Sequence, residues 1–195
     1  MLERARQYAA QSGLVDVPGA PNHTTLMRLV STERKLEDGA TQLNVRFESP
    51  EQAGLKVVKT YTFERGSYAI KVRHEVQNVS AAPLKPQLYL QLQRDGSQIS
   101  GGGPDAFGTG TYTGAAIYHD KIKYTKVDLP GLDKKAFDGE RLAQDGWVSM
   151  VQHYFASAWL RTTPGPREFY ARRVATQLYS VGMVMPLAQI APGAN

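Results

Sequence analysis

The chain has 195 residues, a formal net charge of +5 and no cysteine. This length can bury one sizeable hydrophobic core, and the lack of cysteine excludes disulfides, thiolate catalysis and cysteine-ligated zinc. Basic and acidic residues interleave, as between Asp120 and Arg141, which favours a solvated surface over a nucleic-acid-binding stripe. No run approaches the ~20 apolar residues that cross a bilayer, and the N-terminus lacks the apolar region of a signal peptide.

The two ends of the chain predict little regular structure. Residues 7–10 are compatible with one turn of helix that ends at Gly13, and prolines and glycines follow it. We expect residues 1–22 and 186–195 to be poorly ordered or irregular. Residues 23–30 include a short candidate strand.

The first half of the chain alternates apolar and polar residues, the pattern of strands with one buried and one wet face. Leu43, Val45 and Phe47 show it most clearly. Gly66 suits a tight turn, because glycine adopts the positive φ that a hairpin requires. We therefore predict an antiparallel meander. Its strands are expected at residues 41–48, 55–63, 67–77 and 88–93.

The second half begins with a glycine-rich connection at 101–114. A short strand with a basic outer face is expected at 122–127, and a helical turn at 133–137. After a break at prolines 164 and 166, two further strands close the chain. They are expected at residues 168–174 and 177–185.

Residues 146–160 hold both tryptophans and the densest apolar run, without a charged residue. This composition predicts buried core. Periodicity alone does not distinguish a helix from strands here, but the neighbouring segments are strands. We therefore expect strands at 147–151 and 154–160, and an all-β sandwich overall.

The sequence Gly146-Trp147-Val148-Ser149-Met150-Val151-Gln152-His153-Tyr154-Phe155, followed by Ala158-Trp159, strongly resembles the signature of the large periplasmic domain of the YidC membrane protein insertase family. Residues 10–14, 61–68 and 113–116 agree with it in order. The resemblance implies a twisted antiparallel β-sandwich similar to the galactose-mutarotase-like supersandwich, with one or two helical turns. It also implies that residues 1–195 are a single-domain fragment, since the family's domain begins earlier and ends later.

The same resemblance implies a function without catalysis. The domain would belong to a multi-pass protein of a Gram-negative inner membrane and lie on its periplasmic face. This insertase or chaperone assists insertion and folding of membrane proteins, alone or with the Sec translocon. The implied partners are Sec accessory subunits and nascent inner-membrane proteins. No cofactor, metal or nucleic acid is expected.

Two sets of residues are candidates for binding. Exposed aromatics and lysines on and near the strand expected at 122–127 could form a partner surface, although lysines also protect ordinary edge strands against aggregation. A cleft is the second possibility, with histidines that are more often structural than catalytic. The partner-binding candidates are Tyr118, Lys121, Lys123, Tyr124 and Lys126, and the cleft candidates are His74, Trp147 and His153.

The alternative function is a carbohydrate-binding or sugar-mutarotase-like sandwich. Mutarotation needs a general acid and a general base, for which His74 or His119 could act with Glu75 or Asp120. A spacer without a ligand is a third possibility. Because a truncated sandwich leaves open sheet edges, we also expect some tendency to dimerise.

Overall fold

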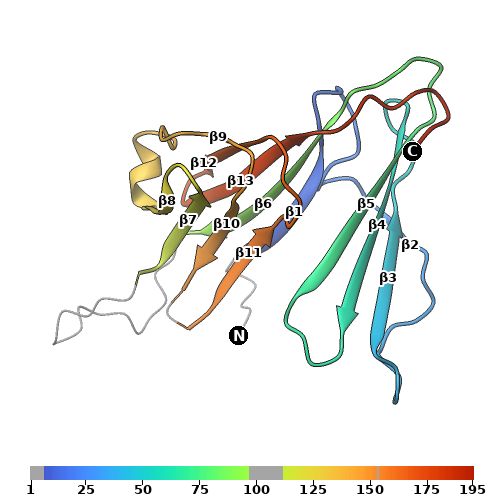
Figure 1. Cartoon of the computed structure of the whole chain (residues 1–195), viewed down its shortest axis with the longest axis horizontal. Helices are drawn as coiled ribbons and strands as arrows, with labels where there is room; N and C mark the ends of the chain where they lie inside the picture. Colours follow the sequence, from blue (N-terminus) through green and yellow to red (C-terminus); the bar gives the residue numbers. More distant parts are fainter. Residues whose placement is uncertain (1–6, 97–111, 153) are drawn as a thin grey trace. The chain divides into compact units, whose positions relative to one another are not determined.

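The computed structural model describes residues 7–96, 112–152 and 154–195. Within these ranges the chain forms three antiparallel sheets and one 3-10 turn (Figure 1). The prediction of an all-β, antiparallel protein is therefore confirmed. The chain divides into two compact units. Unit 1 joins the N-terminal segment up to Ser12 to residues 88–186, and unit 2 joins residues 13–87 to 187–195.

Unit 1 contains two sheets. The five-stranded sheet has the order β1-β6-β13-β12-β9, and the four-stranded sheet has the order β11-β10-β7-β8. The strands of the first are β1 (Tyr8–Val15), whose last residues belong to unit 2, β6 (Gln87–Asp95), β13 (Leu178–Pro186), β12 (Arg167–Ala175) and β9 (Leu142–Ala143). Those of the second are β11 (Ala156–Leu160), β10 (Trp147–Val151), β7 (Gly114–His119) and β8 (Lys123–Val127).

One hydrophobic core lies between the two sheets of unit 1. Ile117, Val148 and Met150 of the four-stranded sheet and Phe169 and Val181 of the five-stranded sheet are fully buried in it. The short 3-10 turn η1 (Pro130–Asp133) adds a buried leucine. Alternate residues of each strand point to opposite faces, so the neighbours of the core residues on β10 and β7 point away from this core.

The N-terminal strand corrects a sequence-based prediction. Residues 8–15 form β1 and not a turn of helix, so the prediction of irregular structure in 1–22 is wrong for this segment. Alanines and glutamine favour a helix locally, but pairing with β6 satisfies the backbone of the segment and overrides that propensity. After Pro186 no strand follows in the described chain, and Ile190 forms an isolated bridge with Leu84.

Strand β6 corrects the predicted meander. It leaves the sheet of β3, β4 and β5 and lies between β1 and β13. Its glutamines suggested a wet face, yet Gln91 is only 6% exposed. The Gln91 amide accepts hydrogen bonds from Tyr170 Oη at 2.7 Å and Ser180 Oγ at 3.1 Å, and it donates one to Gln11 at 2.6 Å. Buried partners of this kind cannot be inferred from alternation alone.

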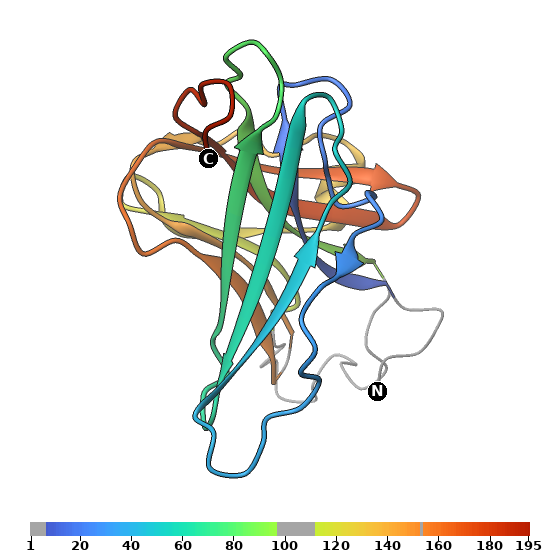
Figure 2. The ribbon, with the colours of Figure 1, turned by 90° about the vertical axis from the view of Figure 1, so that its right-hand side faces the viewer.

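Unit 2 is built on the sheet β2-β3-β4-β5, which faces the viewer in Figure 2. Its strands are β2 (Arg28–Leu29), β3 (Gln42–Glu48), β4 (Leu55–Glu64) and β5 (Ile70–Asn78). The predicted turn between β4 and β5 is present, and Gly66 has a φ of 75°. The strand predicted in 23–30 shortens to the two residues of β2.

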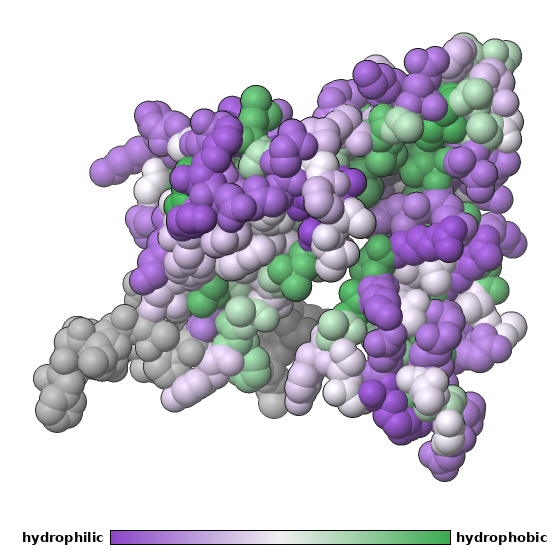
Figure 3. Space-filling view, viewed as in Figure 1, coloured by the Kyte–Doolittle hydropathy of each residue, from purple (hydrophilic) through white to green (hydrophobic). Residues whose placement is uncertain are grey.

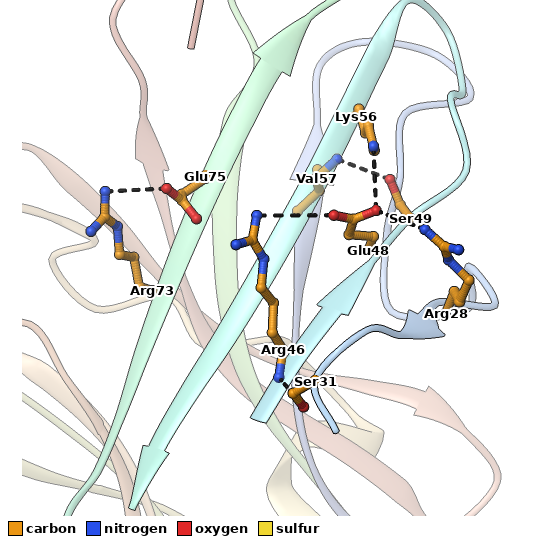
Figure 4. A network of polar contacts seen from close by, with 9 residues as sticks. All are labelled: Arg28, Ser31, Arg46, Glu48, Ser49, Lys56, Val57, Arg73 and Glu75. Carbon is orange, nitrogen blue, oxygen red and sulfur yellow. Dashed lines mark hydrogen bonds and ion pairs between the residues drawn. The ribbon is translucent and has the colours of Figure 1, made fainter. Parts of the chain in front are cut away.

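The polar face of this sheet carries a network of ion pairs (Figure 4). Glu48 is its centre, with Arg28 at 3.2 Å, Lys56 at 3.3 Å and Arg46 at 3.9 Å. Hydrogen bonds from Lys56 and Arg28 lower the pKa of Glu48. These groups are exposed in part, so the network marks a solvated face and adds little stability.

The remaining expectations have mixed outcomes. The strands predicted at 147–151, 168–174 and 177–185 are confirmed. The helical turn lies at η1 and not at 133–137. The tryptophan-rich stretch is buried only in part, since Tyr154 is 82%, Phe155 76% and Leu160 65% exposed. Most of the glycine-rich connection predicted at 101–114 lies outside the described residues.

Candidate functional site

A row of apolar and aromatic side chains crosses the four-stranded sheet of unit 1. Leu160 on β11 is opposite Trp147 on β10, Trp147 is opposite Tyr118 on β7, and Tyr118 is opposite Tyr124 on β8. The Tyr118 and Trp147 rings stack with centroids 5.6 Å apart, and Tyr124 lies 6.0 Å from Trp147. We call these four residues the aromatic row.

The aromatic row lies on the face of the sheet that points away from the core of unit 1. Val148 and Ile117 occupy that core, so the adjacent Trp147 and Tyr118 point to the other side. Strands are about 4.8 Å apart, so the row is about 14 Å long across four strands. Tyr124 is 47% exposed, and Trp147 and Tyr118 are half-buried. The arrangement is an aromatic surface that a partner can cover.

Each of the predicted lysines contacts a neighbouring residue. Lys121 Nζ lies 3.3 Å from Glu140 and donates to the Leu142 carbonyl at 3.2 Å. Lys123 Nζ pairs with Asp120 at 3.4 Å, and the same carboxylate accepts a hydrogen bond from Tyr118 Oη at 3.2 Å.

Lys126 completes the set of predicted lysines. Its Nζ lies 4.9 Å from the centre of the Tyr112 ring, as a cation–π contact. The structure therefore brings Tyr118 and Tyr124 together in the aromatic row, and the three lysines are not part of that row. Lysine is depleted from interface centres and tolerated at rims, so this distribution suits a rim.

Of the three cleft candidates, the structure describes Trp147, which belongs to unit 1, and His74, which belongs to unit 2. Trp147 belongs to the aromatic row, and His153 lies outside the described residues. His74 is on β5 of unit 2, directly opposite Lys59 of β4. The contact of Trp147 with Tyr118 and Tyr124 could not be predicted from the sequence, because these residues are far apart along the chain. For the same reason the sequence did not show that His74 belongs to a different sheet.

His74 has the electrostatics of a buried neutral histidine. Burial lowers its pKa to about 4, and the charge of Lys59 adds to this effect. Burial also lowers the pKa of Lys59, and burial with the Lys59 charge lowers that of His23. A base with a pKa of about 4 is weak at neutral pH. Glu75, the nominated carboxylate, is the next residue of the strand and pairs with Arg73 at 3.2 Å on the other face.

The second nominated acid–base pair is also separated. His119 is the last residue of β7 and is fully buried. Its ring stacks on Phe169 at 5.3 Å, and Nε2 lies 2.9 Å from the Glu140 carbonyl, to which it donates. Asp120 is exposed. A histidine held in the core in this way has a packing role.

One residue of the surface was missed from the sequence. Leu160 extends the row on β11, and only the strand register shows its position. The hydroxyl of Tyr112 donates to the Ala115 carbonyl, lies 2.9 Å from the Val127 carbonyl and accepts from Val127 N at 3.0 Å. Burial raises the pKa of Tyr112 to about 12. Its bonds join the ends of β7 and β8 beneath Lys126, but no pattern in the sequence indicates them.

The described residues include no cluster of three or more metal-ligating side chains. Among their helices, none is long and apolar enough to span a membrane.

Comparison with known proteins assigns this chain to a family. The family model for the YidC periplasmic domain matches residues 1–195, which is the entire chain. The chain belongs to the YidC periplasmic domain family. The family recognised from the tryptophan-rich stretch is therefore confirmed.

Curated relatives of this YidC periplasmic domain carry the name membrane protein insertase YidC. The protein of Aromatoleum aromaticum is 44% identical over 186 residues, which cover 95% of this chain and 33% of the relative. That of Janthinobacterium sp. is 43% identical over 191 residues, covering 97% and 33%. That of Nitrosomonas europaea is 43% identical over 195 residues, covering 98% and 31%. The chain thus spans about a third of the length of these relatives.

Proposed function

We propose that this chain is the non-catalytic periplasmic part of an insertase that assists insertion and folding of inner-membrane proteins, alone or with the Sec translocon. The family match supports this proposal, as do relatives that are named membrane protein insertases. In the described structure Glu75 pairs with Arg73 on the face of β5 opposite His74, and His119 is buried while Asp120 is exposed, so neither His74–Glu75 nor His119–Asp120 forms an acid–base pair. In this proposal the chain contributes binding surfaces at the periplasmic face of the inner membrane.

The observation that carries a partner-binding role is the aromatic row. Its rings are already stacked, so little side-chain entropy is lost when a partner covers them. Tyrosine and tryptophan are enriched at the centres of protein interfaces. The lysines around the row can attract an acidic partner and set its orientation. A Sec accessory subunit that docks here would place an apolar patch over Trp147 and Tyr124 and acidic groups near Lys123.

Site-specific photocrosslinking in native membranes tests this docking surface. A photo-reactive residue replaces Tyr124 in the full-length protein, and the control position is Gln77, which is exposed on the polar face of β5. The expected result is a crosslink to a Sec accessory subunit from position 124 and none from position 77. Equal crosslinking from both positions, or none from 124 in a folded protein, contradicts docking at the row. A crosslink only to nascent substrate would replace docking with substrate capture.

A carbohydrate-binding function is the alternative that the row also allows. Flat aromatic rings beside a carboxylate, as with Tyr118 and Asp120, can stack on and hydrogen-bond a sugar. A rise in thermal stability at high sugar concentration supports this alternative, because a ligand that binds only the folded state stabilises it. An unchanged melting temperature counts against it.

We further propose that the sheets form a supersandwich similar to the galactose-mutarotase-like fold. The antiparallel sheets and the core shared by two of them support this architecture. An experimental structure whose sheets cannot be superposed on such a sandwich contradicts it.

A further inference from the structure

Each described sheet has two outer strands, and five of these six strands have recognisable protection. Strands β2 and β9 have two residues each. Strand β8 carries Lys123 and Lys126, and β5 carries Lys71, Arg73 and Glu75. Strand β1 is half-buried, and the backbone N–H of its Leu14 donates a hydrogen bond to the carbonyl of Pro21 in the following loop at 2.9 Å. Short length, charge and covering loops are the usual ways to prevent pairing at a sheet edge.

Strand β11 lacks this protection. Its sequence Ala-Ser-Ala-Trp-Leu has no charge and no proline, and four of its five residues are exposed. Among the strands of the described chain, only β10 pairs with it. Trp159 fixes β11 in place, because its ring packs on the core and Nε1 donates to the Gln91 carbonyl at 2.9 Å. The edge is therefore held in an extended form before any partner arrives.

The hairpin geometry shows which backbone groups face outward. Gln152 N donates to the Phe155 carbonyl at 2.7 Å, so these two residues form a hydrogen-bonded pair. Such pairs alternate along a regular antiparallel ladder, and the β10–β11 register has no bulge. Ser157 and Trp159 therefore bond to β10. The N–H and C=O groups of Ala156, Ala158 and Leu160 point away from β10.

The surroundings of this edge define what can pair with it. The side chains of Ala156 and Ala158 are small and leave their backbone accessible, and Leu160 continues the aromatic row. Tyr154 and Phe155 in the turn are 82% and 76% exposed. Figure 3 shows a pale to green surface over the β10–β11 hairpin, and hydrophilic purple gathers elsewhere. No charge lies between Gly146 and Leu160 to compensate the desolvation of a charged partner strand.

We propose that β11 binds an extended, uncharged apolar segment of another polypeptide by strand addition, with the outward groups of Ala156, Ala158 and Leu160 as its hydrogen-bond partners. Main-chain bonds give such complexes affinity, and the flanking side chains select the sequence. In an insertase, nascent membrane-protein segments have this chemistry. The identification of these segments as the ligand rests on the proposed function. The geometry of the β11 edge is observed independently of that function.

A peptide-binding experiment with the 195-residue chain tests the proposal. The probe is a fluorescent ten-residue peptide of alternating valine and threonine, capped at both ends, and the comparison peptide has glutamate and lysine in place of threonine. Ala158→Pro removes the outward N–H but no bond to β10, and Ala158→Val is the matched control that keeps this N–H. Proline is tolerated on an edge strand when its position faces solvent.

We expect the uncharged probe to bind the wild-type chain and Ala158→Val within about twofold of each other. Ala158→Pro and the charged peptide should each weaken binding at least about tenfold, the effect of one lost hydrogen bond or one uncompensated charge. Bound peptide should slow hydrogen exchange at the amides of Ala156, Ala158 and Leu160. The amides of Ser157 and Trp159 should not change, because they already bond to β10. Should Ala158→Pro not fold, Ala158→Lys provides the same test through charge.

Several outcomes overturn the proposal. These are no binding of the uncharged probe, equal binding by Ala158→Pro and Ala158→Val, and protection that appears outside β11. If the wild-type chain dimerises and Ala158→Pro is monomeric, the occupant is a second copy. If the three outward amides are already protected in the full-length protein without peptide, another part of that protein occupies the edge. Crosslinking at Tyr124 does not use the edge of β11, so a failed peptide test with successful crosslinking rejects only strand addition.

Discussion

Replacement of Arg167 with methionine should strongly destabilise unit 1. This arginine begins β12 and is 2% exposed. In the described structure its guanidinium donates to four backbone carbonyls, at 2.8 Å to Gly146, 2.9 Å to Thr163, 3.2 Å to Gly165 and 3.3 Å to Gln144. It therefore joins the loop before Trp147 to the loop before β12.

The two shortest hydrogen bonds of Arg167 determine the expected loss in the free energy of unfolding. A hydrogen bond from a charged group contributes about 1.5 kcal/mol or more, so the bonds to Gly146 and Thr163 together contribute about 3 kcal/mol. Methionine replaces the apolar contact of the side chain but none of these bonds. A domain has a free energy of unfolding of about 5–15 kcal/mol, so this loss is a large fraction. At about 2–4 °C for each kcal/mol, the melting temperature should fall by about 6–12 °C.

Urea unfolding followed by tryptophan fluorescence measures this effect, because Trp147 and Trp159 both belong to unit 1. Arg173→Met is the matched control. The Arg173 side chain is 41% exposed and lies 3.6 Å from Asp133, so its loss should cost at most about 1 kcal/mol. Arg167→Lys should be intermediate, since an ammonium reaches fewer carbonyls. A change below about 1 kcal/mol for Arg167→Met would refute the reasoning.

Three further predictions concern other sites. His74 has a pKa of about 4 against 6.5 unfolded, so the unfolded state binds more protons between these values. Stability should therefore fall by up to about 3 kcal/mol as pH drops from 6.5 to 4, and the urea-midpoint profile of His74→Gln should lack this part of the fall. Gly146→Ala should cost more than about 3 kcal/mol, because φ is +105° and the new Cβ would lie 2.1 Å from the Tyr118 carbonyl; a normal yield of folded protein would contradict this. Asn78→Leu should free the C-terminal segment, because the amide donates to Ala82 and Ile190 at 2.8 and 2.9 Å; unchanged proteolysis of residues 187–195 would argue against it.

The family and most strands were predictable from local sequence. The alternation of Leu43, Val45 and Phe47 indicates β3, because a half-buried strand needs a period of two. The tryptophan-rich stretch identified the family, since its order of aromatic residues is specific. It also predicted β10 and a buried core, which is correct for Val148 and Met150 but wrong for Tyr154 and Phe155. These properties depend on neighbours along the chain, so the sequence alone determined them.

The tertiary structure decided which segments meet. Strand register places Leu160, Trp147, Tyr118 and Tyr124 in one row, and register depends on pairing partners that are distant in sequence. The same applies to polar groups such as Gln91 and Arg167, whose burial depends on hydrogen-bond partners from other strands and loops. The open edge of β11 is recognised only when this strand is compared with the other outer strands of the described sheets. No local pattern contains that comparison, because an edge is a property of the assembled sheet.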